Sequence, residues 1–312
     1  MSDRYLVTGG AGFIGSNVVD ELLARGNRVR VLDNFSTGRR ENIAHVQGDI
    51  ELLEGDIRSY ERAQNACKGC DYVIHLAALP SVPRSIQDPL TTDAVNATGT
   101  LNVLLAARDA GVRRVVLASS SSVYGANATL PKREDLVLLP ISPYGVSKLA
   151  AERYACAFHH VYGLETAALR YFNVFGPRQD PNSQYSAVIP RFITRGIRGE
   201  AVMVFGDGSQ TRDFTYVENV VNFTLGACLS DGVSGCAFNV GCGERHSLSD
   251  VIEIIGGLVG AGLEIEYAEP RDGDIKDSWA DVSAIVDATG IHPTIGLEAG
   301  LRLTFNHLAG RE

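Results

Sequence analysis

Hydrophobic residues in the first half of the chain form short runs that alternate with longer stretches of helical spacing. The short runs, each followed by polar or glycine-rich residues, predict strands at Arg4–Thr8, Arg28–Asp33, Tyr72–Ala77, Arg114–Ser119 and Glu165–Tyr171. The longer stretches predict helices at Ile14–Ala24, Asp93–Ala110 and Pro143–Val161. Strands separated by helices of this length are typical of a parallel sheet covered by helices on both faces. We therefore expect an α/β fold with a doubly wound parallel sheet.

The pattern changes after about residue 172, where longer loops carry glycine, proline and arginine. Phe214–Ala227 and Ala237–Val240 nevertheless read as a further helix and strand of the first unit. We expect a first domain over residues 1–172, with segments near 214–240 returning to it, and a smaller α/β domain over 173–312.

Composition and charge exclude several classes of protein. The chain has 312 residues, of which 45% are hydrophobic, and its net charge is −9, so it has no general attraction for nucleic acid. The longest apolar stretches are shorter than a bilayer requires, and the first residues lack the features of a signal peptide. We expect a cytoplasmic protein without a membrane or nucleic-acid partner.

Six cysteines include one Cys-x-x-Cys pair, Cys67 and Cys70. A structural zinc site needs four ligands at suitable spacing, and Cys236 and Cys242 do not supply the second pair. We expect no metal site and reduced thiols, most of them packed in the interior.

A glycine-rich turn follows the first predicted strand and opens the first helix. Gly9, Gly10, Gly12 and Gly15 satisfy both GxGxxG and GxxGxxG. Such glycines let the backbone approach a pyrophosphate, which the N-terminus of the helix then binds. Asp33 ends the next strand at the distance that the dinucleotide fingerprint requires. The turn therefore predicts a Rossmann-type sheet that binds a dinucleotide.

Asp33 also indicates which dinucleotide binds. A carboxylate at this point accepts hydrogen bonds from the ribose hydroxyls and repels a 2′-phosphate, so NAD is favoured over NADP. Arg39 and Arg40 lie nearby in the sequence and are the residues that could hold such a phosphate.

Tyr144 and Lys148 stand four residues apart at the start of a predicted helix, so they share one face. Lowering a phenol pKa from about 10 to near 7 takes roughly 4 kcal/mol, and a neighbouring ammonium together with a cationic nicotinamide ring would contribute to it. Tyr144 is therefore a candidate general base. The serines Ser119–Ser122 follow a predicted strand whose carboxyl end faces the same crevice, and one of them can bridge substrate and phenol.

With these features in place, the chain resembles the extended short-chain dehydrogenase/reductase superfamily over nearly its whole length, and within it the nucleotide-sugar 4-epimerases acting on UDP-glucose or UDP-N-acetylglucosamine. The resemblance rests on Thr8–Gly15, His75–Ala78, Asn96–Gly99, Ser119–Gly125, Tyr144–Lys148, Arg170–Asn173, Arg212–Phe214 and Arg271–Asp274. It implies that NAD is held tightly and recycled within each turnover, that the substrate is a UDP-sugar, and that the protein is a homodimer.

The resemblance also implies a mechanism. Tyr144 takes the proton of the sugar 4-hydroxyl while the 4-hydride passes to NAD. Ser120 orients or relays that proton, and Lys148 binds the nicotinamide ribose and lowers the pKa of Tyr144. The 4-keto sugar then turns over within the site before it is reduced on its other face.

Further contacts follow by the same resemblance. Those implied for the cofactor are Gly9, Gly12, Phe13, Ile14, Asp33, Asn34, Ser36, Thr37, Gly38, Asp56, Ile57, Leu76, Ala77, Ala78, Asn96, Tyr144, Lys148 and Tyr171. Those implied for the substrate are Ser81, Ser120, Ser121, Ser122, Tyr144, Asn173, Ala187, Val188, Phe192, Met203, Val204, Phe205, Arg212, Arg271, Asp274 and Ser278. Arg212 and Arg271 would neutralise the diphosphate, which explains how an acidic protein binds an anionic ligand.

Two departures from related enzymes bear on the reaction and the substrate. Ser121 and Ser122 stand where dehydratases and decarboxylases of the superfamily carry acidic residues, which favours plain epimerisation. Ser278 stands where epimerases restricted to glucose and galactose carry a tyrosine, which leaves room for an N-acetyl group. Ser81–Arg84, Arg178–Asn182 and Pro80, which replaces a family lysine, also resemble the subgroup acting on N-acetylated UDP-sugars.

Two alternatives remain at this point. One is a 4-epimerase of UDP-glucuronate, with Arg84 as a cation for the sugar carboxylate, or another NAD-dependent enzyme that modifies a nucleotide sugar. A non-catalytic NAD-binding regulator is the other, although such a protein has no need of Ser120, Tyr144 and Lys148 together.

Overall fold

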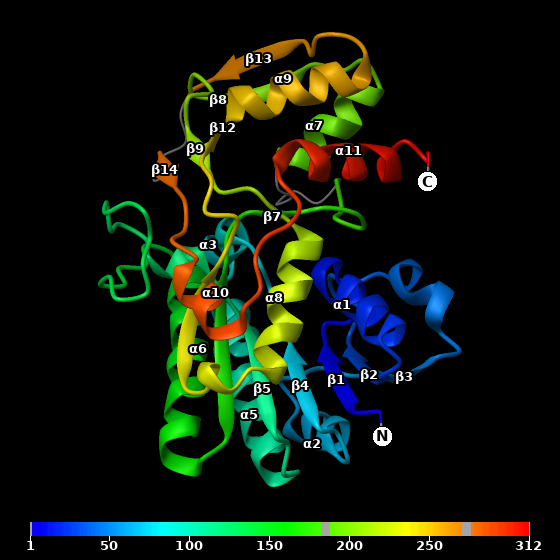
Figure 1. Cartoon of the computed structure of the whole chain (residues 1–312), viewed down its shortest axis with the longest axis vertical. Helices are drawn as coiled ribbons and strands as arrows, with labels where there is room; N and C mark the ends of the chain where they lie inside the picture. Colours follow the sequence, from blue (N-terminus) through cyan, green and yellow to red (C-terminus); the bar gives the residue numbers. More distant parts are fainter. Residues whose placement is uncertain (1, 182–187, 270–275, 312) are drawn as a thin grey trace.

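The computed structural model describes residues 2–181, 188–269 and 276–311. Its largest element is a seven-stranded sheet in the order β11-β6-β5-β4-β1-β2-β3, in which every neighbouring pair is parallel (Figure 1). The strands are β1 (Arg4–Thr8), β2 (Arg28–Asp33), β3 (Ile50–Glu54), β4 (Tyr72–His75), β5 (Arg114–Ser120), β6 (Glu165–Tyr171) and β11 (Cys236–Val240). The strand order reverses between β1 and β4, which confirms the predicted doubly wound Rossmann-type fold.

Helices cover both faces of this sheet, because its central strands are hydrophobic on both sides. On one face lie α1 (Phe13–Ala24) and α8 (Val217–Leu229), and on the other α2 (Tyr60–Cys67), α5 (Gly99–Asp109) and α6 (Pro143–Tyr162). Strand β3 and helix α2 were not predicted. Ile50–Glu54 forms an outer strand in which no residue is fully buried and two glutamates are exposed, so its short sequence lacks the clear period of a half-buried strand.

The predicted helix Asp93–Ala110 is divided in the structure. A short helix, α4 (Pro89–Asp93), leads into a π-helical turn, η2 (Ala94–Thr98), and then into α5. The turn carries Asn96, whose side chain bonds to the backbone of Leu79 in the loop after β4. Single π turns within helices often occur at functional sites.

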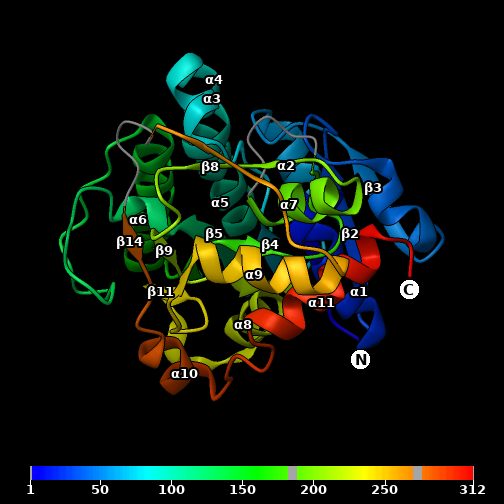
Figure 2. The same cartoon turned by 90° about the horizontal axis from the view of Figure 1, so that it is seen from above.

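Most of the remaining elements form small sheets and helices beyond the carboxyl ends of the main strands (Figures 1 and 2). The helix Ser283–Thr289 instead packs against β11 and α8, and the turn Asp231–Val233 packs against that helix. The strands are β7 (Val174–Phe175), β8 (Val202–Phe205), β9 (Thr211–Arg212), β10 (Thr215–Tyr216), β12 (His246–Ser247), β13 (Ile265–Ala268) and β14 (Asp277–Ser278). The helices are α3 (Val82–Gln87), α7 (Val188–Ile197), α9 (Leu248–Val259), α10 (Ser283–Thr289) and α11 (Leu297–Leu308), with the 3-10 turns η1 (Arg40–Val46), η3 (Ser121–Val123) and η4 (Asp231–Val233).

The second half of the chain contributes to both regions. Strand β11 is an outer strand of the main sheet and α8 packs against that sheet, whereas α7, α9 and α11 pack together above it. The division of the chain at residue 172 stays a prediction.

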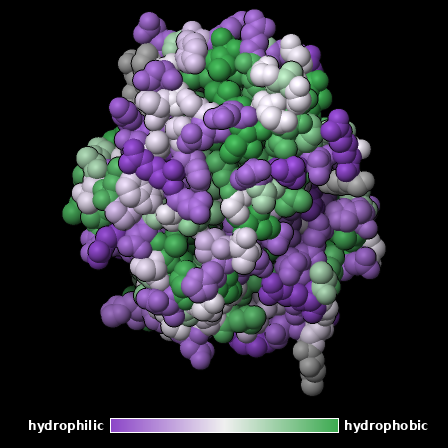
Figure 3. Space-filling view, turned by 45° about the horizontal axis from the view of Figure 1, so that its top comes forward, coloured by the Kyte–Doolittle hydropathy of each residue, from purple (hydrophilic) through white to green (hydrophobic). Residues whose placement is uncertain are grey.

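The face in Figure 3 shows hydrophobic and hydrophilic side chains intermixed. Among the described residues, none of the helices has the length and hydropathy needed to cross a membrane.

Candidate active site

The predicted catalytic and cofactor residues converge at one edge of the main sheet. Thr8, Asp33, His75 and Ser120 are the last residues of β1, β2, β4 and β5, and parallel strands bring their carboxyl ends together. In open α/β sheets ligands bind at this edge, at the point where the strand order reverses.

The glycine turn lies against the end of β4. Gly9 has a φ of 71°, and a Cβ placed there would lie only 2.7 Å from the backbone N of Ala77. No side chain fits at this point, so the backbone alone can form the turn. Gly12 is the N-cap of α1, and Phe13 and Ile14 begin the helix, so the first N–H groups of α1 face the turn.

Asp33 connects the glycine turn with the loop after β2. Its carboxylate is buried and accepts hydrogen bonds from the backbone N of Ala11 (2.9 Å) and of Phe35 (2.8 Å). Burial raises the pKa of Asp33, while these backbone hydrogen bonds oppose the rise. Each carboxylate oxygen has a second lone pair, so the group can still accept ribose hydroxyls.

The two arginines that were candidates for binding a 2′-phosphate, Arg39 and Arg40, form ion pairs with acidic side chains of this chain. Arg39 forms an ion pair with Asp180 at 2.6 Å, and Arg40 forms one with Glu54 at 2.5 Å. The Arg40 guanidinium also lies 4.0 Å from the ring centroid of Phe35. These pairings, together with Asp33, favour NAD over NADP.

Asn96 fixes the loop that contains Leu76, Ala77 and Ala78. Its Oδ1 accepts from the backbone N of Leu79 (2.8 Å), and its Nδ2 donates to the carbonyl of Leu79 (3.2 Å) and to Ser147 Oγ (3.1 Å). Ser147 lies on α6 beside Lys148, so one buried amide connects the cofactor loop with the catalytic helix.

His75 lies beneath the same loop and was not singled out from the sequence as a separate residue. The Thr100 hydroxyl donates to the carbonyl of Asn96 (2.6 Å) and therefore accepts from His75 Nε2, 3.0 Å away. The bare Nδ1 then accepts from Thr8 Oγ1 at 2.7 Å. Burial, with a smaller contribution from the charge of Lys148, lowers the pKa of His75 to about 3, so the imidazole is neutral.

Helix α6 presents Tyr144 and Lys148 to the site. The Ser142 hydroxyl caps the helix by accepting from the backbone N of Gly145 (3.1 Å), and Pro143 occupies its first turn. Lys148 is buried, and its Nζ donates to the carbonyl of Ala118 near the end of β5 at 2.8 Å. Burial lowers the pKa of Lys148 to about 8.

The pKa of Tyr144 differs from the sequence-based expectation. Burial raises it, and a hydrogen bond to the Ser120 side chain only partly opposes the rise. The expected lowering by Lys148 is not seen in the chain by itself, because desolvation dominates and the ammonium bonds to Ala118. The spacing correctly placed the two residues on one helix face, but it could not show the cost of burying the phenolate.

The serine turn after β5 places Ser120 beside the phenol. Ser120 Oγ accepts from the backbone N of Ser122 (3.1 Å), which caps the 3-10 turn η3. The hydroxyl hydrogen of Ser120 is thereby left for another acceptor. Ser121 and Ser122 are partly exposed within the same turn.

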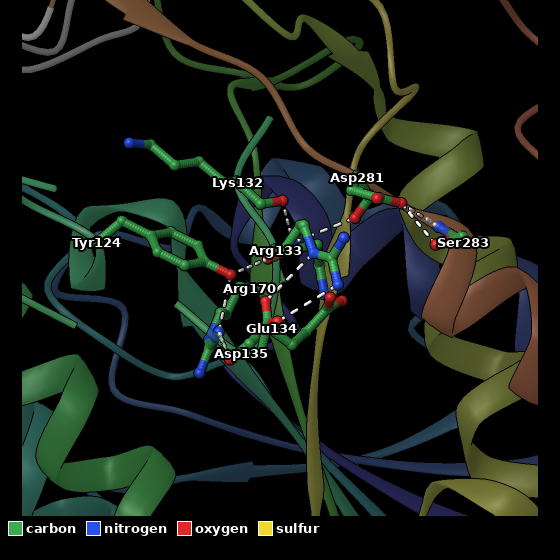
Figure 4. Close-up of polar contacts among 9 residues, drawn as sticks. Tyr124, Lys132, Arg133, Glu134, Asp135, Arg170, Asp281 and Ser283 are labelled. Atoms are coloured by element: carbon green, nitrogen blue, oxygen red, sulfur yellow. Dashed lines mark hydrogen bonds and ion pairs between the residues drawn. The ribbon is translucent and has the colours of Figure 1, made fainter. Parts of the chain in front are cut away.

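A buried polar network supports this turn from behind. Arg170 on β6 pairs with Glu152 on α6 at 2.6 Å, and Glu152 also accepts from Ser119 Oγ (3.0 Å). Figure 4 shows Arg170 pointing toward the hydroxyl of Tyr124, to which it donates at 2.8 Å. That hydroxyl donates in turn to Asn239 Oδ1 (2.7 Å) on β11. Of these residues, Ser119, Tyr124 and Arg170 lay within the motifs Ser119–Gly125 and Arg170–Asn173, but nothing in their spacing revealed the contacts.

On the substrate side, Asn173, Arg212 and Ser278 lie close together. Asn173 Nδ2 donates to the carbonyl of Asp213 (3.2 Å), and the backbone N of Asp213 donates to the carbonyl of Ser278 (2.9 Å). Arg212 Nη1 donates to the carbonyls of Thr211 and Lys276, both at 2.9 Å. The predicted contacts Ala187, Arg271 and Asp274 lie outside the described residues.

The side chains of several other predicted substrate contacts lie in the hydrophobic core, on the surface or in a helix cap. The side chains of Phe192 and Val204 lie in the hydrophobic core, whereas Met203 is exposed and Phe205 partly so on the same strand as Val204. Val188 is the partly buried first residue of α7. Ser81 caps α3 by accepting from the backbone N of Arg84 (3.1 Å).

Tyr171 points away from the catalytic cluster. Its hydroxyl lies 2.7 Å from Thr224 Oγ1 on α8, so any contact with a cofactor has to come from its backbone. On the adenosine side, Asn34 Nδ2 donates to Asp56 Oδ2 (2.9 Å), beside the buried Ile57. Ser36 and Thr37 are exposed, and Gly38 is partly buried. Within residues 2–181, 188–269 and 276–311, the acidic, histidine and cysteine side chains form no group of three or more that could hold a metal ion.

These features fit a bound dinucleotide. The turn at Gly9 has no room for a side chain, the N-terminus of α1 offers N–H groups to a diphosphate, and the buried Asp33 can accept ribose hydroxyls.

Comparison with known proteins agrees with this geometry. The NAD dependent epimerase/dehydratase family matches residues 5–241. A UDP-glucose 4-epimerase of Mycolicibacterium smegmatis is 40% identical over 305 residues, covering 96% of this chain and 97% of that protein. A UDP-glucuronate 4-epimerase of Thermodesulfobacterium geofontis is 36% identical over 313 residues, covering 97% and 95%.

Among solved structures, UDP-N-acetylglucosamine 4-epimerase from Methanobrevibacter ruminantium M1, in complex with UDP-N-acetylmuramic acid, has a TM-score of 0.95 at 38% identity, with 100% of both chains covered. The sheet order, the glycine turn and these matches along the whole length lead to one conclusion: the chain belongs to the NAD dependent epimerase/dehydratase family.

Proposed function

We propose that this protein is an NAD-dependent 4-epimerase of UDP-hexoses. The observation that carries the proposal is that Ser120, Tyr144 and Lys148 lie together at the edge of the sheet where the glycine turn also lies. A binding protein without chemistry has no need of this set. The relatives named above, which include 4-epimerases of UDP-glucose and UDP-N-acetylglucosamine, support it.

Tyr144 acts as the general base that removes the proton of the sugar 4-hydroxyl. Ser120 bonds to the phenol and can donate its hydroxyl hydrogen to the substrate oxygen as charge develops there. Lys148, with a pKa of about 8, is largely protonated at neutral pH and stands where it can bind a ribose hydroxyl. The chemistry that bound NAD supplies is the reversible oxidation of the sugar at C4, and its cationic ring favours the phenolate of Tyr144.

The cofactor stays bound through the reaction cycle in this proposal. The turn at Gly9–Gly15 holds the diphosphate, Asp33 holds the adenosine ribose, and Asn96 keeps the loop Leu76–Ala78 against the site. Because the sugar leaves at the same oxidation level at which it enters, the enzyme gains nothing by releasing the cofactor.

The residues beside Ser120 favour epimerisation over elimination. A β-elimination would require an acid or a base next to the 4-keto sugar. Ser121 and Ser122 are the side chains that follow Ser120 in this turn, and neither is a carboxylate.

The substrate is a UDP-sugar whose 2-substituent lies near Ser278. Arg212 binds the diphosphate and Asn173 the adjacent part of the nucleotide, with Arg271, Asp274 and Ala187 as further predicted contacts. A serine at residue 278 leaves space that a tyrosine would fill, so UDP-N-acetylglucosamine and UDP-N-acetylgalactosamine are accepted together with UDP-glucose and UDP-galactose.

The protein acts as a cytoplasmic homodimer in this proposal. Leu90 on α4 is 83% exposed, and Val146 and Tyr154 on the neighbouring α6 are exposed as well. Large apolar side chains on adjacent helices are typical of a surface that a second copy of the chain covers. Analytical ultracentrifugation should show a dimer, and Tyr154→Glu should shift it toward the monomer.

Product analysis by NMR tests the activity directly. UDP-glucose, UDP-N-acetylglucosamine and UDP-glucuronate are offered separately, and we expect inversion at C4 of the first two. Tyr144→Phe should reduce turnover by roughly 10²–10⁴-fold while NAD remains bound. Appreciable turnover by that variant would refute the assigned base, and inversion of UDP-glucuronate alone would refute the assigned substrate.

A further inference from the structure

Three predicted substrate contacts meet at Asp213, a residue that has no exposed surface. Asp213 follows Arg212 directly, its backbone N donates to the carbonyl of Ser278 (2.9 Å), and its carbonyl accepts from Asn173 Nδ2 (3.2 Å). The nucleotide contacts and the residue beside the sugar are therefore joined through one amino acid.

The side chain of Asp213 connects further segments. Oδ1 accepts from the backbone N of Cys242 (2.8 Å), and Oδ2 accepts from the backbone N of Gly243 (2.9 Å) and of Ala280 (3.2 Å). The hydroxyl of Thr215 approaches Oδ1 at 3.4 Å. The carboxylate thus holds the loop after β11 and the segment after Ser278 against the turn that carries Arg212.

The carboxylate of Asp213 is fully buried, so it needs hydrogen-bond donors in place of water. Asp213 is 0% exposed, and a carboxylate in such a place is tolerated only when its oxygens are hydrogen-bonded. Burial raises the pKa of Asp213, and the hydrogen bonds from Cys242, Ala280 and Gly243 oppose the rise. Three backbone donors on one side chain form a rigid connection, whose loss would release all the attached segments together.

The absence of a side chain at Gly241 leaves room for the carboxylate of Asp213. A Cβ on Gly241 would lie 2.7 Å from Asp213 Oδ2. A side chain there would therefore displace the carboxylate. The segment after Ser278 is also held from its other side, where the backbone N of Asp281 donates to the carbonyl of Lys132 at 2.8 Å (Figure 4). Asn239 Nδ2 donates to the carbonyl of Asp281 at 3.1 Å.

We infer that Asp213 is the positioning residue of the substrate site, and that it sets the relative placement of Arg212, Asn173 and Ser278 without touching the substrate. This inference rests on the proposed function, since it assumes that those three residues contact a UDP-sugar. It predicts that Asp213 governs how firmly the nucleotide is held and which sugar is accepted, while the chemistry at Tyr144 is nearly independent of it.

Asp213→Asn tests the inference with almost no change in volume. Both carboxylate oxygens accept backbone N–H groups, so an amide NH₂ faces a donor in either orientation. We expect KM for the UDP-sugar and Kd for UDP alone to rise by roughly tenfold to a hundredfold, because small displacements of binding groups have effects of that size. Turnover at saturation should change by less than about threefold, because the lost contacts bind the nucleotide equally in the ground state and in the transition state. The ratio of activities on UDP-N-acetylglucosamine and UDP-glucose should also change.

Two further variants separate positioning from general loss of stability. Gly241→Ala retains every atom of Asp213 but pushes its carboxylate, and it should raise KM in the same way. Arg114→Met is the control. Arg114 is a buried side chain at the start of β5, the end of that strand far from Ser120, and it donates to the carbonyls of Ala227 and Cys228. The substitution should lower the melting temperature and leave KM unchanged.

The outcomes are distinguishable by UDP titration calorimetry of the purified holoenzyme. Unchanged UDP affinity and sugar preference in both Asp213→Asn and Gly241→Ala would overturn the inference alone. An increase in KM of the same size in Arg114→Met would also overturn it, as a mere consequence of lower stability. Absence of UDP binding by the unaltered chain would overturn the proposed function and the inference together.

Discussion

Replacing Lys148 by methionine should make the folded protein more stable while it abolishes turnover. Lys148 is 6% exposed and its ammonium has one described hydrogen bond, to the carbonyl of Ala118 at 2.8 Å. Its pKa is lowered by burial from 10.5 to about 8. Each pKa unit is worth about 1.4 kcal/mol, so the buried charge costs the folded state about 3 kcal/mol at neutral pH.

Part of this gain is offset in the variant. The hydrogen bond from the ammonium to Ala118 is lost, which costs about 1.5–3 kcal/mol for a charged donor. The methionine side chain nearly preserves the volume of the buried stem. We therefore expect the free energy of unfolding of Lys148→Met at pH 7 to exceed that of the unaltered protein by up to about 1.5 kcal/mol, which is the difference between the two effects.

The pH dependence distinguishes this explanation from improved packing. Lys148 has a folded-state pKa of about 8 and an ordinary value of 10.5, so its cost is fully present below pH 8 and disappears as the pH rises through 10.5. The advantage of the methionine variant should accordingly shrink and then reverse between these two pH values, because the variant still lacks the hydrogen bond to Ala118 when the lysine is neutral. Urea unfolding of nucleotide-free protein at pH 7 and at pH 10 measures it.

Lys68→Met provides the matched control, because Lys68 is an exposed lysine. It should show no pH-dependent difference from the unaltered protein. If Lys148→Met were less stable than the unaltered protein by the same amount at both pH values, the assigned desolvation of the ammonium would be wrong.

The remaining predictions concern substrate, stability and cofactor. Ser278→Tyr should reduce kcat/KM for UDP-N-acetylglucosamine while UDP-glucose is still converted, and an unchanged ratio would contradict the proposed space beside the sugar. Glu152→Gln should lower the free energy of unfolding by about 3–5 kcal/mol, as measured in urea, because it leaves the guanidinium of Arg170 buried without its counter-charge. Asp33→Ser should weaken NAD binding and allow some NADP binding through Arg39, and calorimetry with both dinucleotides would expose an error if NADP still failed to bind.

Features written in short stretches of sequence could be recognised without the structure. The strand runs Arg4–Thr8, Arg28–Asp33 and Glu165–Tyr171 have in the structure the bounds predicted from their hydrophobicity. The glycine turn and the four-residue spacing of Tyr144 and Lys148 were equally readable, because backbone conformation and helical periodicity act over a few residues. The outer strand Ile50–Glu54 was missed because none of its residues is fully buried. A strand shows alternating hydrophobic and polar residues only where one of its faces is buried.

The sequence by itself therefore determined the sheet of parallel strands, the dinucleotide turn and the identity of the candidate catalytic residues. Only the tertiary structure decided that Arg39 pairs with Asp180, that burial raises the pKa of Tyr144, and that Asp213 joins Arg212 to Ser278. Desolvation and long-range hydrogen bonds depend on which segments meet in space, and the carboxylate of Asp213 reaches Ala280 across 67 residues of sequence. No local pattern encodes such a contact, because it exists only after the sheet has brought both segments to the same edge.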